Sequence, residues 1–312
     1  MLTSQQKNQF RRQVLSWYRK NQHDLPWRKT RDPYKILVSE VMLQQTQVER
    51  VKEKWPEFLK QFSTLKSLSL SPTAKVIQAW KGMGYNRRAL YLQKTAQSVM
   101  EKYGGKFPQT LKELRTLPGV GEYTARALLV FAFEKSYIAP DVNVVRILYR
   151  SFPSPLHKGH RLRRGPAYLK IKVVGGEEVG RGWVRRLIAI GDAIVTPKTA
   201  YDLNQALMDL GRTVCTAKNP KADLCPLHHR HESVVSKRLQ KKEPMFAGVP
   251  RRIWRGRIVE LIRRKKRFHQ DSVFAMLGIQ QDSQSKQWLQ SVLRQLTSDG
   301  LLVRHRETVT FP

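Results

Sequence analysis

Residues 33–136 consist of short helical patterns interrupted by proline and glycine, and they contain no convincing strand of alternating apolar and polar residues. The interruptions fall at Pro72, Gly82-Met83-Gly84, Gly104-Gly105, Pro108 and Pro118-Gly119. Short helices bury their apolar stripes only by packing against other helices. The segment therefore predicts a mainly α fold built from several closely packed helices.

Helical spacing also marks the chain on both sides of this segment. Residues 4–20 carry four large apolar side chains at helical spacing: Phe10, Val14, Trp17 and Tyr18. A helical pattern returns at 201–214. Residues 153–200 are glycine-rich, basic and poorly periodic, so that a solvated loop and a DNA-facing basic insertion both remain open. A lineage-specific insertion and a reading-frame error would each explain this stretch.

The last quarter of the chain has its own organisation. Residues 236–249 are charged and include Pro244, which is typical of a linker. Three apolar helical patterns follow, around Ile258, Phe274 and Val292, and residues 301–303 and 308–310 predict a hairpin. Three helices and a terminal hairpin are the elements of a winged helix, a variant of the helix-turn-helix.

These patterns predict a division of the chain into five parts. An N-terminal helix (1–26) packs with a lobe formed by 150–235, which includes the basic insertion. Residues 27–149 form a six-helix domain, 236–249 a linker and 250–312 a winged-helix-like domain.

The charge balance narrows the class of partner. The chain has 58 Lys and Arg against 24 Asp and Glu, which gives a formal net charge of +34 and favours a polyanionic partner. A membrane is the weaker candidate, because no apolar run reaches about 18 residues. The only cysteines, Cys215 and Cys225, exclude a disulfide framework and favour a reducing cytoplasm.

One glycine-containing turn is a candidate contact with DNA phosphates. In Leu117-Pro118-Gly119-Val120-Gly121, two glycines precede a helical stretch. Such a turn lets backbone N–H groups approach an anion without obstruction by Cβ atoms. The backbone at Gly119, Val120 and Gly121 would then hold a duplex without reading its sequence. A purely structural turn is the alternative.

Two carboxylates are candidate catalytic groups. Glu40 lies within the apolar run 36–43, and Asp141 precedes Val142 and Asn143. Apolar surroundings should raise the pKa of a carboxyl group and allow it to donate a proton near neutral pH. A carboxylate on a helix face or at a helix cap is the structural alternative for each.

Taken together, these segments resemble the A/G-specific adenine DNA glycosylases (the MutY family) of the helix-hairpin-helix superfamily. The most diagnostic segment is Ser39-Glu40-Val41-Met42-Leu43-Gln44-Gln45-Thr46. The resemblance also runs through residues 25–28, 33–34, 82–85, 117–125, 141–144 and 204–211. It implies a two-lobed helix-hairpin-helix fold. A short C-terminal winged-helix-like unit resembles that of some bacterial members, whereas others carry a Nudix-like domain there.

The resemblance also implies a role for each site residue. Glu40 protonates adenine, and Asp141 stabilises the oxocarbenium-like sugar, as paired carboxylates do in glycoside hydrolysis. Tyr123 and Asn143 orient the acid and the sugar. The substrate-binding residues are Arg28 and Gln205 at the adenine, Gln45 and Tyr85 in the base stack, and Leu43 and Thr46 in the diagnostic segment. The adenine must first leave the stack.

One position separates this chain from similar glycosylases. Members of the endonuclease III group carry a lysine nucleophile in the hairpin motif, where this chain has Tyr123. Without that amine no Schiff base is expected there, which indicates a monofunctional glycosylase. A thymine or other mismatch glycosylase and a non-catalytic DNA-binding protein remain as alternatives. The expected partner is mismatched double-stranded DNA, bound by a monomer at the bacterial nucleoid.

The chain departs from the family at its expected iron–sulfur loop. The family holds a 4Fe-4S cluster with four cysteines, whereas the corresponding positions here are Cys215, Ala222, Cys225 and His231. An ordinary cluster is therefore not expected. Zinc held by Cys215, Cys225, His228 and His231 and a metal-free loop both remain open. The glycosylase chemistry itself requires no metal.

Overall fold

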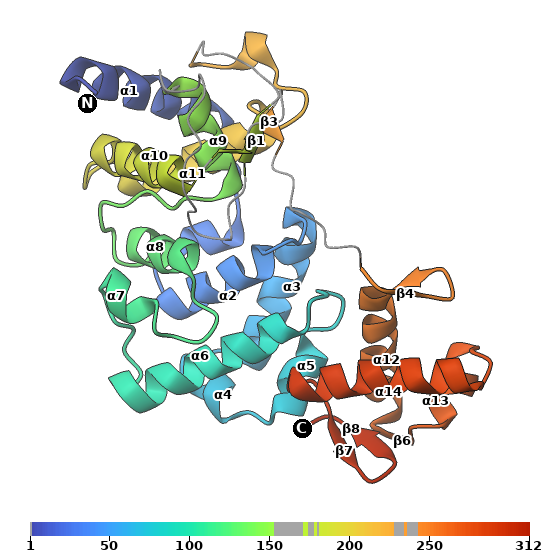
Figure 1. Cartoon of the computed structure of the whole chain (residues 1–312). Helices are drawn as coiled ribbons and strands as arrows, with labels where there is room; N and C mark the ends of the chain where they lie inside the picture. The colour runs from blue at the N-terminus through green and yellow to red at the C-terminus, as the bar shows by residue number, and fades with distance from the viewer. Residues whose placement is uncertain (1, 153–170, 174–177, 180, 228–233, 236–242) are drawn as a thin grey trace. The chain divides into compact units, whose positions relative to one another are not determined.

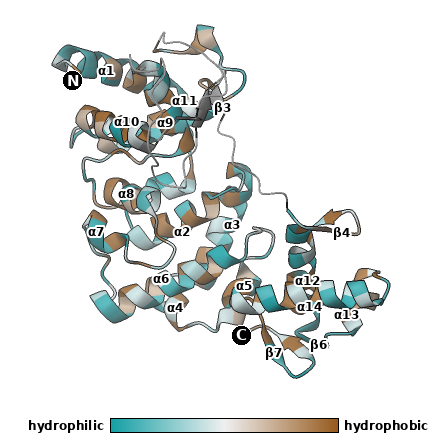
Figure 2. Ribbon diagram, viewed as in Figure 1, coloured by the Kyte–Doolittle hydropathy of each residue, from teal (hydrophilic) through white to brown (hydrophobic). Residues whose placement is uncertain are grey.

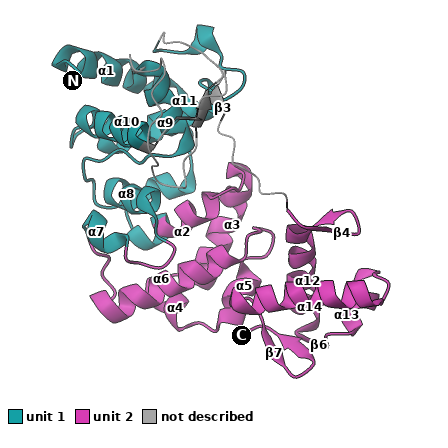
Figure 3. Ribbon diagram, in the orientation of Figure 1, with its two compact units in different colours: residues 1–36, 109–115, 120–239 teal, residues 37–108, 116–119, 240–312 magenta. Residues whose placement is uncertain are grey.

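The computed structural model describes residues 2–152, 171–173, 178–179, 181–227, 234–235 and 243–312. The chain forms two compact units (Figure 3). Unit 1 contains residues 1–36, 109–115 and 120–239, and unit 2 contains 37–108, 116–119 and 240–312. Helices dominate both units (Figure 1), which confirms the predicted mainly α class. The predicted boundaries at residues 26, 149, 235 and 249 remain a prediction.

Unit 1 is built mainly from helices that pack on one another. Its elements are α1 (Ser4–Asn21), η1 (Pro26–Lys29), α7 (Leu111–Leu114), α8 (Glu122–Phe131), α9 (Val142–Ser151), α10 (Arg181–Ile194), α11 (Ala200–Thr213) and η3 (Ala222–Leu224). Three short antiparallel strands join them in the order β2-β1-β3: β1 (Ile171–Val173), β2 (Glu178–Val179) and β3 (Val234–Val235). Helix α11 packs against α1 and α9.

Helix α1 shows how the local sequence produces its element. Thr3 and Gln6 form a reciprocal capping box at its start, and the basic Arg19 and Lys20 lie in its last turn, where they complement the helix dipole. Of the four predicted apolar residues, Phe10, Val14 and Tyr18 are buried and Trp17 is half-buried.

Helix α10 corrects the solvated-loop interpretation of 153–200 for the part from Arg181 to Ile194. Trp183, Val184, Leu187 and Ile188 are buried at helical spacing. Helix α10 contains two glycines, Gly182 and Gly191, and at Gly191 a Cβ would lie 2.9 Å from the Ile138 side chain. Gly191 lowers the helix propensity of this segment, but its lack of a side chain allows α10 to pack closely against Ile138. The basic residues at 157–164 lie outside the described residues.

Unit 2 combines a helical part with the C-terminal part of the chain. The helical part contains α2 (Pro33–Leu43, whose first turn belongs to unit 1), α3 (Val48–Gln61), α4 (Leu65–Leu70), α5 (Thr73–Ala79) and α6 (Arg87–Tyr103). The C-terminal part contains β4 (Met245–Phe246), β5 (Val249–Pro250), α12 (Arg251–Lys265), β6 (Arg267–His269), α13 (Ser272–Leu277), α14 (Ser283–Ser298), β7 (Val303–His305) and β8 (Thr308–Thr310).

The C-terminal part has the three predicted helices and an antiparallel sheet in the order β6-β8-β7. Teal polar and brown apolar residues both appear along α14 (Figure 2), whose Leu289, Val292, Leu293 and Leu296 are buried at helical spacing, as in an amphipathic helix. Residues Ile258, Val273, Val292 and Val309 are fully buried in one shared core.

Two predictions for the C-terminal part are wrong in detail. The hairpin β4–β5 (Met245–Pro250) overlaps the end of the predicted linker 236–249; Phe246 stacks on Trp288 at 4.2 Å, and its carbonyl accepts from Trp254 Nε1 at 3.0 Å. The predicted first strand of the terminal hairpin, 301–303, begins only at Val303. Leu301 and Leu302 are both buried, so they cannot alternate as strand residues do.

Among the described residues, no helix is both long enough and apolar enough to span a membrane.

Candidate active site

Glu40, the predicted proton donor, lies in unit 2 in the last turn of α2. Its side chain is buried, with 5% of its surface exposed. Helix α2 has apolar residues around much of its circumference, and Leu37, Val41 and Met42 beside Glu40 are buried. The helix therefore holds one carboxylate among largely apolar neighbours.

The two residues predicted to enter the base stack lie in exposed loops of unit 2. Gln45 follows the end of α2, and Tyr85 precedes the start of α6. Both have left-handed backbone, with φ of 59° and 43°, although neither is glycine. Tyr85 exposes 57% of its surface. Exposed residues in a sparsely populated backbone region indicate that the surrounding structure imposes their conformation.

A buried arginine, Arg88, connects these two loops. Its Nη1 donates to the carbonyls of Val41, Met42 and Gln44 at 2.9, 2.9 and 2.5 Å. Its Nη2 donates to Thr46 Oγ1 at 3.0 Å and to the carbonyls of Met83 and Gly84 at 2.7 and 3.2 Å. The guanidinium thus satisfies carbonyls at the end of α2, and it holds the Gln45 and Tyr85 loops together.

Arg88 was not among the sequence predictions. Burial lowers the pKa of its guanidinium to about 10, so it stays charged at neutral pH. In the sequence, Arg88 directly precedes the apolar Ala89 and Leu90, but this position does not identify its partners. Leu43, also predicted at the substrate, is half-buried between Met42 and the Gln45 loop.

The glycine turn predicted to hold DNA phosphates joins α7 to α8. Gly119 has φ of 76°, and a Cβ at this position would lie 2.7 Å from Tyr91 Cβ. Both the backbone conformation and the close approach of Tyr91 therefore require glycine here. The next two residues differ in burial: Val120 is buried, whereas Gly121 is exposed and is the N-cap of α8. The exposed N-terminus of a helix offers backbone N–H groups to an anion.

Asp141, the second predicted carboxylate, lies in unit 1 as the N-cap of α9. Its Oδ1 accepts from the backbone N–H of Val144 at 2.7 Å, and its Oδ2 accepts from Asn143 Nδ2 at 2.9 Å. Two of the predicted site residues, Asp141 and Asn143, are therefore in direct contact. Tyr123, another predicted site residue, is half-buried in the first turn of α8.

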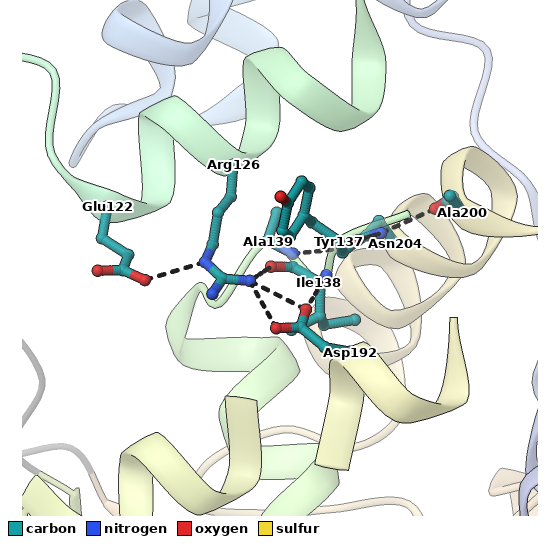
Figure 4. Close-up of polar contacts among 8 residues, drawn as sticks. All are labelled: Glu122, Arg126, Tyr137, Ile138, Ala139, Asp192, Ala200 and Asn204. Carbon is teal, nitrogen blue, oxygen red and sulfur yellow. Dashed lines mark hydrogen bonds and ion pairs between the residues drawn. The ribbon is translucent and has the colours of Figure 1, made fainter. Parts of the chain in front are cut away.

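The backbone that leads into Asp141 is fixed by a polar network (Figure 4). Asn204 Oδ1 accepts from the Ala139 N–H at 2.7 Å, and Asn204 Nδ2 donates to the Tyr137 carbonyl at 2.9 Å. Asp192 Oδ1 accepts from the Ile138 N–H at 2.8 Å and pairs with Arg126 at 2.9 Å. Each peptide group from 137 to 139 is thereby held by a side chain. Sequence reasoning missed Asp192, because the helix that carries it was not predicted.

The pKa of Asp141 leads to a pH-dependent prediction. Burial raises this pKa above 3.8, although hydrogen bonds from Val144 and Asn143 lower it. The folded protein then keeps a proton at pH values where the unfolded chain has lost it. The contribution of Asp141 to the free energy of unfolding is therefore fully present below the unfolded pKa, and it is lost as pH rises through the folded pKa.

Asp141→Asn should remove this dependence, since an amide does not ionise. The difference in Tm, variant minus wild type, should become more positive from roughly pH 4 to pH 7. Thermal unfolding at several pH values measures it. Asp223→Asn, at an exposed position, is the control. A difference for Asp141→Asn that does not change with pH would contradict the raised pKa.

Two residues predicted to line the adenine pocket lie on η1 and α11 of unit 1. Arg28 forms a bidentate pair with Asp209, at 2.8 Å from Nη1 and 2.9 Å from Nη2. Only 10% of the Arg28 side chain is exposed, so this pair joins η1 firmly to α11. Gln205 is buried on α11, next to Asn204.

The degenerate loop around Cys215 connects to Asp141 through two arginines. Arg146 donates to Asn143 Oδ1 at 2.7 Å and to the Cys215 carbonyl at 2.8 Å. Arg150 Nη1 lies 2.9 Å from Cys215 Sγ. A charged residue within the apolar run Val144-Val145-Arg146-Ile147-Leu148 was a sequence signal for this buried network.

The described residues of this loop do not fit a four-thiolate cluster. Cys215 and Cys225 are buried, but Ala222, in η3, supplies no donor atom. His228 and His231 lie outside the described residues. Within the described parts of the chain, no three His, Cys, Asp or Glu side chains are grouped so as to hold a metal ion.

Comparison with known proteins identifies the class of this fold and site. Residues 38–162 match the family model of the HhH-GPD superfamily base excision DNA repair proteins. Glu40, the glycine turn and Asp141 all fall within this match. A solved thermostable thymine-DNA glycosylase is 27% identical, with a TM-score of 0.60; the alignment covers 71% of this chain and 93% of that one. The chain is thus a DNA glycosylase of the helix-hairpin-helix type.

Curated relatives identify the family within this class. The adenine DNA glycosylase of Mycolicibacterium smegmatis is 33% identical over 80% of this chain and 79% of its own length. The adenine DNA glycosylase of Mycobacterium tuberculosis is 35% identical over 80% of this chain and 77% of its own length. The chain belongs to the adenine DNA glycosylase family.

Proposed function

We propose that this protein hydrolyses the N-glycosidic bond of adenine mispaired with 8-oxoguanine or guanine in double-stranded DNA. The observation that carries the proposal is the burial of Glu40, 5% exposed, in the apolar last turn of α2. Adenine leaves poorly until a ring nitrogen is protonated, and a buried carboxylic acid supplies that proton.

Asp141 has the complementary role in this proposal. Departure of adenine leaves positive charge on the sugar, and an ionised Asp141 stabilises that charge. Asn143 donates to Asp141 Oδ2 at 2.9 Å and so fixes the direction of the carboxylate. The side chains of Asn204 and Asp192 hold the preceding backbone in place. Tyr123, Arg28 and Gln205 complete the adenine site in this proposal.

Gln45 and Tyr85 act on the duplex rather than on the bond. Each is exposed on a loop whose conformation Arg88 fixes. We propose that they enter the stack, and that the adenine leaves it, as enzymes that modify bases in a duplex require. Leu43 and Thr46 flank Gln45 and support it from the same segment. The backbone at Gly119, Val120 and Gly121 holds a phosphate.

Excision assays on a set of duplexes test this function. Duplexes with A opposite 8-oxoguanine, A opposite guanine and T opposite guanine are incubated with the full chain and then treated with alkali. We expect cleavage at adenine only, and only after alkali, because Tyr123 provides no amine for strand cleavage. Preferential release of thymine would select the alternative activity, since a thymine-DNA glycosylase has a similar structure. If no base is released from any duplex, the alternative of a non-catalytic DNA-binding protein is favoured.

We also propose that the protein acts as a monomer at the nucleoid and needs no metal for the reaction. Purified protein should lack the absorbance of an iron–sulfur cluster, because Ala222 replaces one thiolate ligand and His231 another. Elemental analysis measures this directly. About four irons per chain would contradict the proposal. One zinc per chain would instead select Cys215, Cys225, His228 and His231 as ligands.

A further inference from the structure

The Tyr85 loop, residues 80–86, accepts hydrogen bonds from side chains of the helical part of unit 2. Arg88 donates to the carbonyls of Met83 and Gly84. Trp80 Nε1 donates to the Gly84 carbonyl at 3.1 Å, and Arg50 Nη1 donates to the Gly82 carbonyl at 3.1 Å. These contacts fix the middle of the loop, but they do not account for the orientation of its last residue, Asn86.

The C-terminal part of unit 2 holds Asn86 through Arg263 on α12. Arg263 Nη2 donates to Asn86 Oδ1 at 2.8 Å and to the Ile77 carbonyl at 3.0 Å. Only 9% of the Arg263 side chain is exposed, and burial lowers its pKa. One guanidinium therefore ties the end of the Tyr85 loop to the last turn of α5, where carbonyls lack helical partners.

Asn86 makes its hydrogen bond with Arg263 in place of the N-capping hydrogen bond that is common at its position. It is the N-cap of α6, a position where an asparagine oxygen usually accepts from the helix backbone. Here its side chain makes no such capping bond, and its oxygen accepts from Arg263 instead. The orientation of Asn86 thus depends on Arg263 of α12, 177 residues further along the chain.

Two further contacts flank the Tyr85 loop. Glu260, which accepts from Arg263 at 3.2 Å, also lies 3.6 Å from Lys81 Nζ within the loop. Asp299, at the end of α14, lies 3.3 Å from Arg87 Nη1, directly after the loop. The apolar cores are continuous as well, since Ile77 and Leu90 belong to the buried cluster of the C-terminal part.

We propose that the C-terminal part of unit 2 positions the Tyr85 loop for entry into the DNA stack, with Arg263 as the positioning residue. This inference rests on the role proposed above for Tyr85. Its physical basis is preorganisation: a loop that is already held in a sparsely populated conformation loses less entropy when it enters DNA. The C-terminal part then contributes to base extrusion without touching the scissile bond.

The test compares Arg263→Gln with Arg264→Gln in the full-length chain. Both variants lose one positive charge from the same helix, and both positions neighbour Glu260, but the Arg264 side chain is 72% exposed. Hydrogen exchange of the amides of residues 80–86 is measured without DNA. Fluorescence of 2-aminopurine at the target position opposite 8-oxoguanine reports base extrusion at saturating enzyme. Adenine excision is measured under single-turnover conditions on the matching substrate.

Arg263→Gln should accelerate loop exchange and slow both extrusion and excision by about tenfold, which corresponds to about 1.4 kcal/mol. Arg264→Gln should change each by less than about twofold. Equal behaviour of the two variants overturns the proposal, and so does faster loop exchange with unchanged extrusion. Asn86→Ala tests whether Arg263 acts through Asn86. In the double variant Asn86→Ala/Arg263→Gln, extrusion and excision should be little slower than in Arg263→Gln alone.

Arg263→Lys is the conservative variant that keeps the proposal testable if Arg263→Gln fails to fold. An ammonium group still donates to Asn86 or Ile77, so this variant should recover part of the extrusion signal. If the wild type releases adenine from no duplex, the proposed function is wrong. The exchange and extrusion measurements would still decide whether Arg263 controls the loop.

Discussion

Replacing Glu40 by glutamine is expected to slow adenine excision by about a thousandfold while leaving DNA binding nearly unchanged. Glutamine has the size and shape of glutamate and fits the same buried position, 5% exposed, in the last turn of α2. Its amide cannot protonate a leaving base at neutral pH, so only the chemical step should suffer. Single-turnover excision on an A:8-oxoguanine duplex and a binding titration measure the two effects separately.

The matched control for this prediction is Glu49→Gln. Glu49 is an exposed carboxylate in the first turn of α3, and it pairs with Lys52 at 3.2 Å. Loss of an exposed pair costs less than about 1 kcal/mol, so excision should stay near the wild-type rate. An excision rate for Glu40→Gln within about tenfold of wild type would remove Glu40 from the role of general acid.

Elements with a strong local pattern could be predicted from the sequence. Helix α1 and the three C-terminal helices α12, α13 and α14 lie where their apolar spacing indicates. The N-cap position of Asp141 follows from an acidic residue directly before an apolar helical run. In each case the information lies within one or two turns of helix, which periodicity detects well.

Elements that depend on packing between distant segments could not be predicted. Helix α10 contains glycines that weaken its local pattern, and one of them, Gly191, packs directly against Ile138. The hairpin β4–β5 depends on Phe246 stacking on Trp288, which is 42 positions further along the chain by number. A local reading of charge and proline indicates a linker there, because the stabilising contact is not local.

The candidate site shows the same division. The diagnostic segment 39–46 pointed to Glu40 and Gln45, and the segment around Asp141 pointed to Asn143. The residues that hold these groups were missed, because Arg88, Asp192 and Asn204 act on backbone atoms that are distant in sequence. Arg88, for example, bonds to the Val41 carbonyl, 47 residues away. Such a contact follows from the tertiary structure alone.

Arg88→Met is therefore expected to destabilise the protein by more than about 3 kcal/mol, which is large for a single substitution. The Arg88 guanidinium satisfies five carbonyls and the Thr46 hydroxyl in a site that is 8% exposed. Methionine fills similar space but donates nothing, so the buried carbonyls of Val41, Met42 and Met83 lose this donor. Denaturant unfolding measures the loss. Lys94→Met, at an exposed position on the same helix, is the control.

Arg88→Lys separates the structural effect from the functional one. Its ammonium has three donors and cannot reach both loops as the planar guanidinium does, so this variant should fold with part of the lost stability restored. Because it no longer ties the Gln45 loop to the Tyr85 loop, its excision rate at saturating enzyme should still fall by about tenfold or more. A folded Arg88→Lys variant with wild-type excision would show that the connection between the loops stabilises the fold but plays no part in the reaction.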